Sequence, residues 1–150
     1  MAKLYFKYGA MGSSKTAQAL ITKFNYEEKG MRVLLLKPAV DTRDGETIVK
    51  SRIGLSSEAL VFRRDANLFD IIRYNDIARY PDAVIIDEAQ FLTRKQTEQL
   101  RMAVDKENIS VLCFGLRTDF QVRLFEGSKA LFELADSISE IKSICRCGNK

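Results

Sequence analysis

The stretch that most constrains the fold is GAMGSSKT, at residues 9–16. Residues 3–8 before it alternate as a β-strand does, and residues 17–24 after it have the pattern of a helix. A strand, a glycine-bearing turn, a Lys-Thr pair and a helix, in this order, are typical of a phosphate-binding loop. In such a loop, the backbone N–H groups of the turn and of the first helical turn point at an anion.

The loop assigns roles to two side chains. Lys15 is expected to reach the β- and γ-phosphates of a nucleotide, and the Thr16 hydroxyl to ligate Mg²⁺. The loop departs from the usual pattern at Ser14, which stands where glycine normally precedes the lysine. Serine can serve there only if its φ is ordinary, since glycine alone adopts positive φ freely. The alternative is a Gly/Ser turn followed by a Lys-Thr pair that occurs by chance.

The composition predicts one domain and excludes several classes of protein. A chain of 150 residues with 46% hydrophobic and 29% charged residues is long enough for one core. The net charge of +4 fits a phosphorylated ligand, but without a Lys/Arg block or a tryptophan we do not expect a nucleic-acid partner. The apolar runs are too short for a membrane span, and no signal peptide precedes the first strand, so the cytoplasm is expected. Three cysteines do not favour a disulfide framework.

Strands and helices alternate along the chain. Beyond the first strand and a helix that ends near residue 29, we predict strands at 31–37, 59–62, 82–88, 109–115 and 137–144. A helix that Asp65 or Asn67 caps is predicted to end near residue 74, and further helices are predicted at 93–106, with Thr93 as the cap, and at 128–134. Pro38 is expected to stop the second strand, and residues 40–57 to form a long flexible loop. The pattern predicts an α/β fold of the P-loop NTPase (RecA-like) type, with a mostly parallel central sheet flanked by helices.

Two adjacent acids, Asp87 and Glu88, follow the apolar run AVII. A carboxylate at the carboxyl end of a buried strand, beside a phosphate loop, can hold Mg²⁺, and we assign this role to Asp87. Because side chains alternate across a strand, Glu88 would face a substrate hydroxyl and act as the general base. The alternative is a solvated strand end with two surface acids.

A further cation is usual in phosphoryl transfer, and the loop after the second strand contains a candidate. Arg43 is predicted to lie near the phosphates, with Asp41 close to the metal site. A solvated ion pair within the loop explains the same two residues equally well.

Several motifs follow one another along the chain: the phosphate loop, Asp41-Thr42-Arg43, the strings DEAQF at 87–91 and GLRTDFQ at 115–121, and a Cys-x-Cys knuckle. A resemblance to the thymidine kinase family shared by bacteria and the animal cytosol rests on these motifs. It implies transfer of the γ-phosphate of ATP to the 5′-hydroxyl of thymidine or deoxyuridine, in nucleotide salvage for DNA synthesis. It also implies a homotetramer and a kinase domain that covers residues 1–144.

The resemblance extends the set of predicted site residues. ATP would contact residues of the loop and of the DEAQ string: Gly9, Ala10, Met11, Gly12, Ser13, Ser14, Lys15, Thr16, Asp87, Glu88, Ala89 and Gln90. The nucleoside base would lie among apolar and aromatic side chains, which suit a flat ring: Met11, Phe91, Leu116, Phe120 and Phe125. The alternative is that these phenylalanines belong to an ordinary core.

The knuckle at residues 145–150 is expected to be the start of a second, truncated zinc-binding and lasso segment. Cys145 and Cys147 supply at most two of the four ligands that a closed zinc site needs, so zinc is expected only in a longer chain. Two other functions stay open at this point. One is a P-loop ATPase that acts on DNA, with Glu88 activating water, and the other is a nucleotide-binding fragment without turnover.

Overall fold

The computed structural model describes residues 1–10, 14–39, 47–75, 79–118 and 123–142. The strands are β1 (Leu4–Gly9), β2 (Val33–Pro38), β3 (Ile48–Lys50), β4 (Ser56–Glu58), β5 (Leu60–Phe62), β6 (Ala83–Ile86), β7 (Ser110–Leu116) and β8 (Ser137–Glu140). The helices are α1 (Lys15–Glu28), α2 (Leu68–Tyr74), α3 (Arg94–Glu107) and α4 (Glu126–Leu134), and a 3-10 turn, η1, spans Ala89–Phe91.

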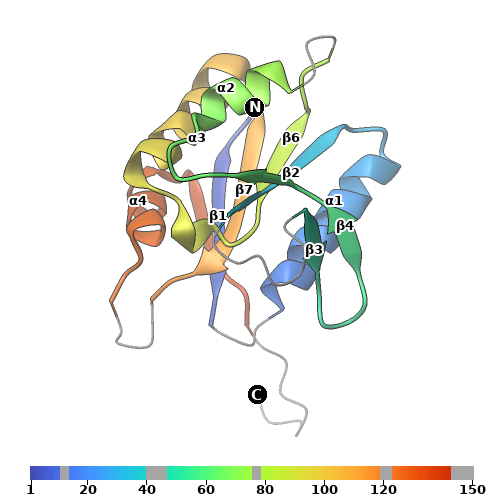
Figure 1. Cartoon of the computed structure of the whole chain (residues 1–150), viewed down its shortest axis with the longest axis horizontal. Coiled ribbons are helices and arrows are strands. Elements are labelled where there is room, and N and C mark those ends of the chain that lie inside the picture. The colour runs from blue at the N-terminus through green and yellow to red at the C-terminus, as the bar shows by residue number, and fades with distance from the viewer. Residues whose placement is uncertain (11–13, 40–46, 76–78, 119–122, 143–150) are drawn as a thin grey trace, which may run out of the picture.

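The central sheet has six strands in the order β5-β2-β6-β7-β1-β8, and every neighbouring pair is parallel (Figure 1). All four residues of β6 are buried, as the unbroken apolar run predicts for a strand covered on both faces. In a parallel sheet the carboxyl ends of the strands share one edge. The segments that follow β1, β6 and β7 therefore meet at that edge, and the predicted α/β fold with a parallel sheet is confirmed.

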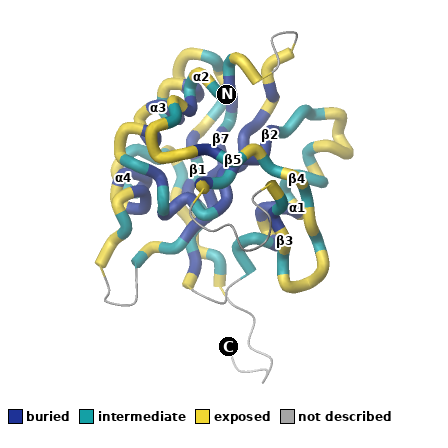
Figure 2. The backbone as a smooth tube through the Cα atoms, in the orientation of Figure 1, coloured by how far each residue is buried: buried dark blue, intermediate teal, exposed yellow. Residues whose placement is uncertain are grey.

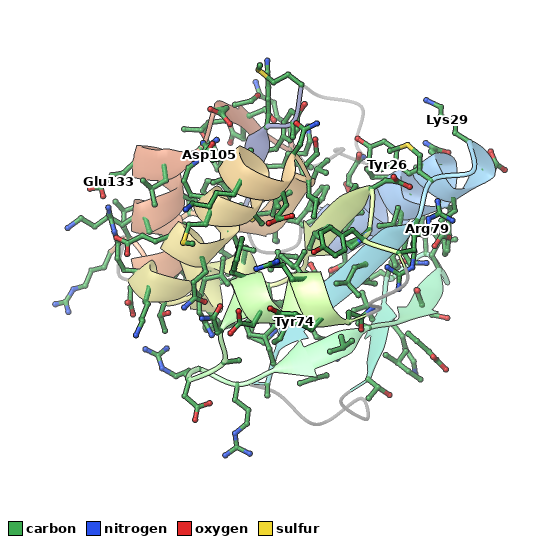
Figure 3. The ribbon with its side chains drawn as sticks, turned by 90° about the horizontal axis from the view of Figure 1, so that it is seen from above. Tyr26, Lys29, Tyr74, Arg79, Asp105 and Glu133 are labelled. Carbon is green, nitrogen blue, oxygen red and sulfur yellow. The ribbon has the colours of Figure 1, made fainter. Side chains whose placement is uncertain are left out.

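Helices cover both faces of the sheet, and successive residues of one strand pack into different layers. Val84 and Ile86 of β6 pack on the side of α2, α3 and α4, whereas Ala83 and Ile85 pack on the side of α1 and β3. The buried strands lie between these layers (Figure 2). Seen from above, Asp105 and Glu133 of α3 and α4 lie on the opposite side of the molecule from Tyr26 and Lys29 at the end of α1 (Figure 3).

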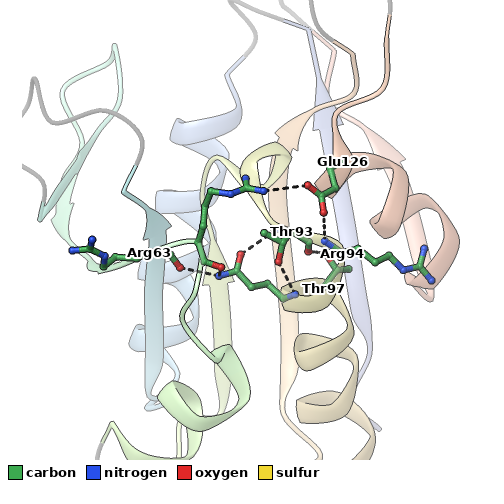
Figure 4. A network of polar contacts seen from close by, with 7 residues as sticks. Arg63, Thr93, Arg94, Thr97 and Glu126 are labelled. Atoms are coloured by element: carbon green, nitrogen blue, oxygen red, sulfur yellow. Dashed lines mark hydrogen bonds and ion pairs between the residues drawn. The ribbon is translucent and has the colours of Figure 1, made fainter.

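Side-chain caps fix where two of the helices begin. Asn67 accepts a hydrogen bond from the Asp70 N–H and caps α2, and Thr93 and Gln96 form a capping box at the start of α3. Gln96 also donates to the carbonyl oxygens of Arg63, Arg64 and Ala66, which ties the turn before α2 to α3. Figure 4 shows this network. Glu126, the first residue of α4, accepts from the backbone N–H of Arg94 at 2.8 Å and so connects α4 to the start of α3.

The prediction of a flexible loop over residues 40–57 is wrong for its second half, because β3 and β4 form an antiparallel hairpin there. Tertiary contacts hold the hairpin: Val49 is buried against α1, and the Lys37 ammonium donates to the Ile48 carbonyl at 2.8 Å. Gly54, with φ +93°, makes the turn between the two strands. Several boundaries also differ: β2 begins at Val33 and includes Pro38 as its last residue, α4 begins at Glu126, and β8 ends at Glu140.

Gly127 in the first turn of α4 allows a close backbone approach. A Cβ atom there would stand 2.5 Å from the Ala89 oxygen and 2.8 Å from the Leu92 oxygen. At an open helical position, replacing glycine by alanine stabilises a protein by up to about 1 kcal/mol. We expect Gly127→Ala to have the opposite effect and to lower the free energy of unfolding by about 1–3 kcal/mol, because the contacted atoms belong to rigid backbone. Urea unfolding of this variant, beside Lys129→Ala at an exposed position of the same helix, measures the effect. Equal or higher stability of Gly127→Ala would contradict the packing.

Candidate active site

The start of α1 meets two requirements of a phosphate loop, an unstrained residue before the lysine and uncapped N–H groups. Ser14 has φ −92°, an ordinary value for serine, so the absence of glycine at this position causes no strain. Helix α1 begins at Lys15, and no side-chain cap from Ser14 bonds its first N–H groups. The first N–H groups of a helix have no partner within the helix. This end can therefore receive an anion between β1 and α1.

The Lys15 side chain reaches back to the end of β1, where its ammonium donates to the Ala10 carbonyl at 3.1 Å. Burial lowers the pKa of Lys15, the carboxylates of Glu88 and Asp87 raise it, and the Arg52 guanidinium lowers it further. Both acids are thus close enough to act on the lysine. Arg52 lies in the turn between β3 and β4 and was not predicted as part of the site. Its stretch of sequence has no clear period, and only the packing of the hairpin brings it near Lys15.

The acid pair and the loop come together although they are far apart in the chain. The Thr16 hydroxyl donates to Asp87 Oδ2 at 3.3 Å, across 71 residues of sequence. Asp87 is 5% exposed, and its N–H donates to the Leu36 carbonyl at 2.9 Å, which anchors the end of β6 to β2. One magnesium triphosphate could therefore contact Lys15, Thr16 and Asp87 together. The alternative of a solvated strand end with two surface acids is therefore wrong for Asp87, because this residue is buried.

Burial, and after it the neighbouring Glu88 carboxylate, raise the pKa of Asp87 from 3.8 to about 6. The Glu88 N–H, the Thr16 hydroxyl and the Lys15 ammonium act in the opposite direction. The charged form of Asp87 is therefore costly in the protein without ligands. A divalent cation at this carboxylate would remove that cost.

We expect Asp87→Asn to stabilise the metal-free protein at pH 7 by about 2–3 kcal/mol. The pKa of Asp87 is raised on folding, so its contribution to stability is present below pH 4 and is lost as the pH rises to 6. Asparagine does not titrate, so the variant does not lose this stability as the pH rises. Its free energy of unfolding should equal that of the wild type near pH 4. Urea unfolding in EDTA between pH 4 and 8 measures the difference. A difference that does not change with pH would contradict the raised pKa.

Glu88 does not lie in the strand, which corrects the prediction of a strand over residues 82–88. β6 ends at Ile86, and Glu88 has φ +54°, in the left-handed region that non-glycine residues seldom adopt. It is this left-handed turn, and not the alternation of a strand, that separates the two carboxylates. The Gln90 side chain donates to Glu88 Oε1 at 2.7 Å. Left-handed residues of this kind cost about 1–3 kcal/mol and occur often at functional sites.

The predicted nucleoside residues that the structure describes lie around the end of β7. The rings of Phe91 and Phe125 meet edge to face with centroids 5.7 Å apart, and both are half-buried. Leu116, also half-buried, donates from its N–H to the Gln90 side chain at 3.1 Å. Eight predicted site residues lie outside the described residues: Met11, Gly12, Ser13, Asp41, Arg43, Phe120, Cys145 and Cys147.

The donor set fits a magnesium ion bound mainly through phosphate. Mg²⁺ commonly uses one or two protein oxygens together with phosphates and water, and the Thr16 hydroxyl and the Asp87 carboxylate provide such oxygens. Within the described residues, no group of three or more His, Cys, Asp or Glu side chains could hold a metal by itself. In the same part of the chain, every helix is too short or too polar to cross a bilayer.

Comparison with known proteins gives consistent matches over the whole chain. The family model described as thymidine kinase matches residues 2–150. The thymidine kinases of Zymomonas mobilis and of phage T4 are 48% and 47% identical to this chain over 150 residues. That of Haemophilus influenzae is 49% identical over the same length. In each case all of this chain and 78% of the relative are covered. The matches include both the loop at residues 9–16 and the acid pair.

Proposed function

The chain belongs to the thymidine kinase family, and from this premise we propose that it transfers the γ-phosphoryl group of ATP to the 5′-hydroxyl of thymidine or deoxyuridine. The observation that carries the proposal is the hydrogen bond between Thr16 and Asp87, because it brings the phosphate loop to the acid pair. Phosphoryl transfer needs clamped phosphates, neutralised charge and an aligned acceptor. The residues at this edge of the sheet can meet all three needs.

In the proposed reaction, Lys15 and the N–H groups at the start of α1 hold the β- and γ-phosphates. Thr16 and Asp87 would hold Mg²⁺, which neutralises charge on the phosphates when it is bound. Glu88 accepts the proton of the 5′-hydroxyl while that oxygen bonds to the γ-phosphorus and the bond to the β–γ bridging oxygen breaks. Thymidine monophosphate and ADP leave. Arg52, and Arg43 from the preceding loop, would add positive charge beside the transferred group.

The nucleoside is proposed to lie at the end of β7. Phe91, Phe125 and Leu116 form one side of this region, and their apolar surfaces suit a pyrimidine ring. The adjacent Glu88 carboxylate is then on the same side of the site as the 5′-hydroxyl that it would deprotonate. Met11 and Phe120 are proposed to complete the pocket.

The family also supports proposals about assembly and location. We propose a homotetramer in the cytoplasm, with ATP and thymidine as its small-molecule substrates and no nucleic-acid partner. Cys145 and Cys147 would bind structural zinc only with two additional ligands. Zinc analysis of the purified protein and sedimentation at several concentrations test these two points.

ATP turnover measured with thymidine, with DNA and with neither distinguishes the candidate functions. We expect thymidine monophosphate and ADP in equal amounts when thymidine is present, and no stimulation by DNA. DNA-stimulated hydrolysis without thymidine phosphorylation would favour the P-loop ATPase. Binding of ATP with no product under any condition would favour a nucleotide-binding fragment.

A further inference from the structure

Gln90 is buried directly beside the proposed base. It lies in η1, is 3% exposed, and uses both ends of its amide. Its Nε2 donates to Glu88 Oε1 at 2.7 Å, and its Oε1 accepts from the Leu116 N–H at 3.1 Å. A backbone N–H can only donate, so it selects the amide oxygen and turns the amide NH₂ toward Glu88. The orientation of Gln90 is thus fixed by the end of β7.

The neighbouring backbone is shaped to hold this amide. A Cβ atom at Gly115 would stand 2.8 Å from Gln90 Oε1 and 2.9 Å from the Gln90 backbone nitrogen, so only glycine leaves the space. On the other side, the Leu116 carbonyl accepts from the buried Ser128 hydroxyl of α4. A continuous path of hydrogen bonds therefore runs from Glu88 through Gln90 and Leu116 to Ser128.

We propose that Gln90 is a positioning residue, whose amide holds the Glu88 carboxylate in the orientation that receives the substrate proton. The bond to Oε1 leaves Oε2 as the oxygen directed to the 5′-hydroxyl. The same amide joins the base to Leu116, at the edge of the proposed nucleoside pocket, so base and nucleoside keep one relative position. The inference rests on the proposed function. It gives Gln90 the positioning of Glu88 as its main role, where the resemblance implied contact with ATP.

A purely structural role is the competing explanation, because a buried amide that bonds a backbone N–H also stabilises the fold. Two variants separate the roles. Gln90→Met keeps the volume and removes both hydrogen bonds. Gln90→Glu keeps an oxygen for the Leu116 N–H but replaces the donor to Glu88 by a second carboxylate. Gln99→Met is the matched control, since Gln99 is also buried and accepts from the Leu68 N–H at 2.8 Å.

The test is a double-mutant cycle in the steady-state phosphorylation of thymidine, with the folded fraction checked by circular dichroism. We expect Gln90→Met and Gln90→Glu to lower kcat on the order of tenfold to a hundredfold, because small misplacements of a reacting group have effects of this size. The KM for ATP should stay unchanged. In the Glu88→Gln background, Gln90→Met should cause no further loss, because the carboxylate through which it acts is absent. Gln99→Met should leave kcat unchanged.

Three results would overturn the inference. These are an equal loss from Gln90→Met in both backgrounds, near-normal kcat for Gln90→Glu, and a rise in the KM for ATP in place of the fall in kcat. Failure of the proposed function itself would be seen in the two proteins that keep Gln90. The wild type would then form no thymidine monophosphate, or Glu88→Gln alone would be fully active.

Discussion

Replacing Glu88 by glutamine should lower kcat for thymidine phosphorylation by about 10²–10⁴-fold, the range typical of a lost general base. Glutamine has nearly the same shape as glutamate and can still accept the hydrogen bond from Gln90. It cannot take the proton of the 5′-hydroxyl. The affinity for ATP should change little, because the phosphates are held by the start of α1 and by Lys15. Single-turnover kinetics together with binding of ATP measure the two quantities separately.

The control for this variant is Glu98→Gln, which makes the same chemical change at an exposed position of α3. Glu98 pairs with Arg94 on the helix surface, far along the chain from the loop. Its kcat should equal that of the wild type. If Glu88→Gln also turns over thymidine at a near-normal rate, Glu88 is not the base, and the left-handed turn that presents it needs another explanation.

Much of the fold could be predicted because short stretches of sequence, such as apolar runs and helix caps, indicate its strands and helices. The apolar runs 33–36 and 83–86 predict buried parallel strands, and Thr93 predicts the start of α3. Of the two candidate caps for α2, Asp65 and Asn67, the structure uses Asn67. The β3–β4 hairpin could not be predicted in the same way. Its strands are short and polar, and it is held by Val49 against α1 and by the Lys37 bond to Ile48, which are contacts between distant parts of the chain.

The site shows the same division between local and distant signals. The loop and the acid pair follow from residue types at fixed spacing, and the parallel sheet then brings their strand ends to one edge. The left-handed φ of Glu88, the proximity of Arg52 to Lys15 and the bond from Leu116 to Gln90 have no local signal. Each depends on how β6, β7 and the hairpin pack together.

Replacing Lys15 by alanine should lower kcat/KM for ATP by about 10²–10³-fold, the size seen when one electrostatic stabiliser is removed from a reacting centre. The half-buried ammonium lies at the Ala10 carbonyl and near Asp87 and Glu88, so burial limits how far water can screen its charge. Unlike Glu88→Gln, this change should weaken ATP binding as well as transfer. Isothermal titration with ATP and initial rates of thymidine phosphorylation measure both effects.

Lys95→Ala is the matched control, since it removes the same charge from the first turn of α3 at an exposed position. If the loss came from net charge, the two variants would behave alike and both would recover at high salt. Because burial lowers the pKa of Lys15, its removal should also leave the unliganded protein at least as stable as before. Lys15→Ala should therefore be folded but weak in binding and turnover. Unchanged ATP affinity and unchanged rates in that folded variant would remove the loop at residues 9–16 from the proposed reaction, since the clamp on the phosphates depends on this ammonium.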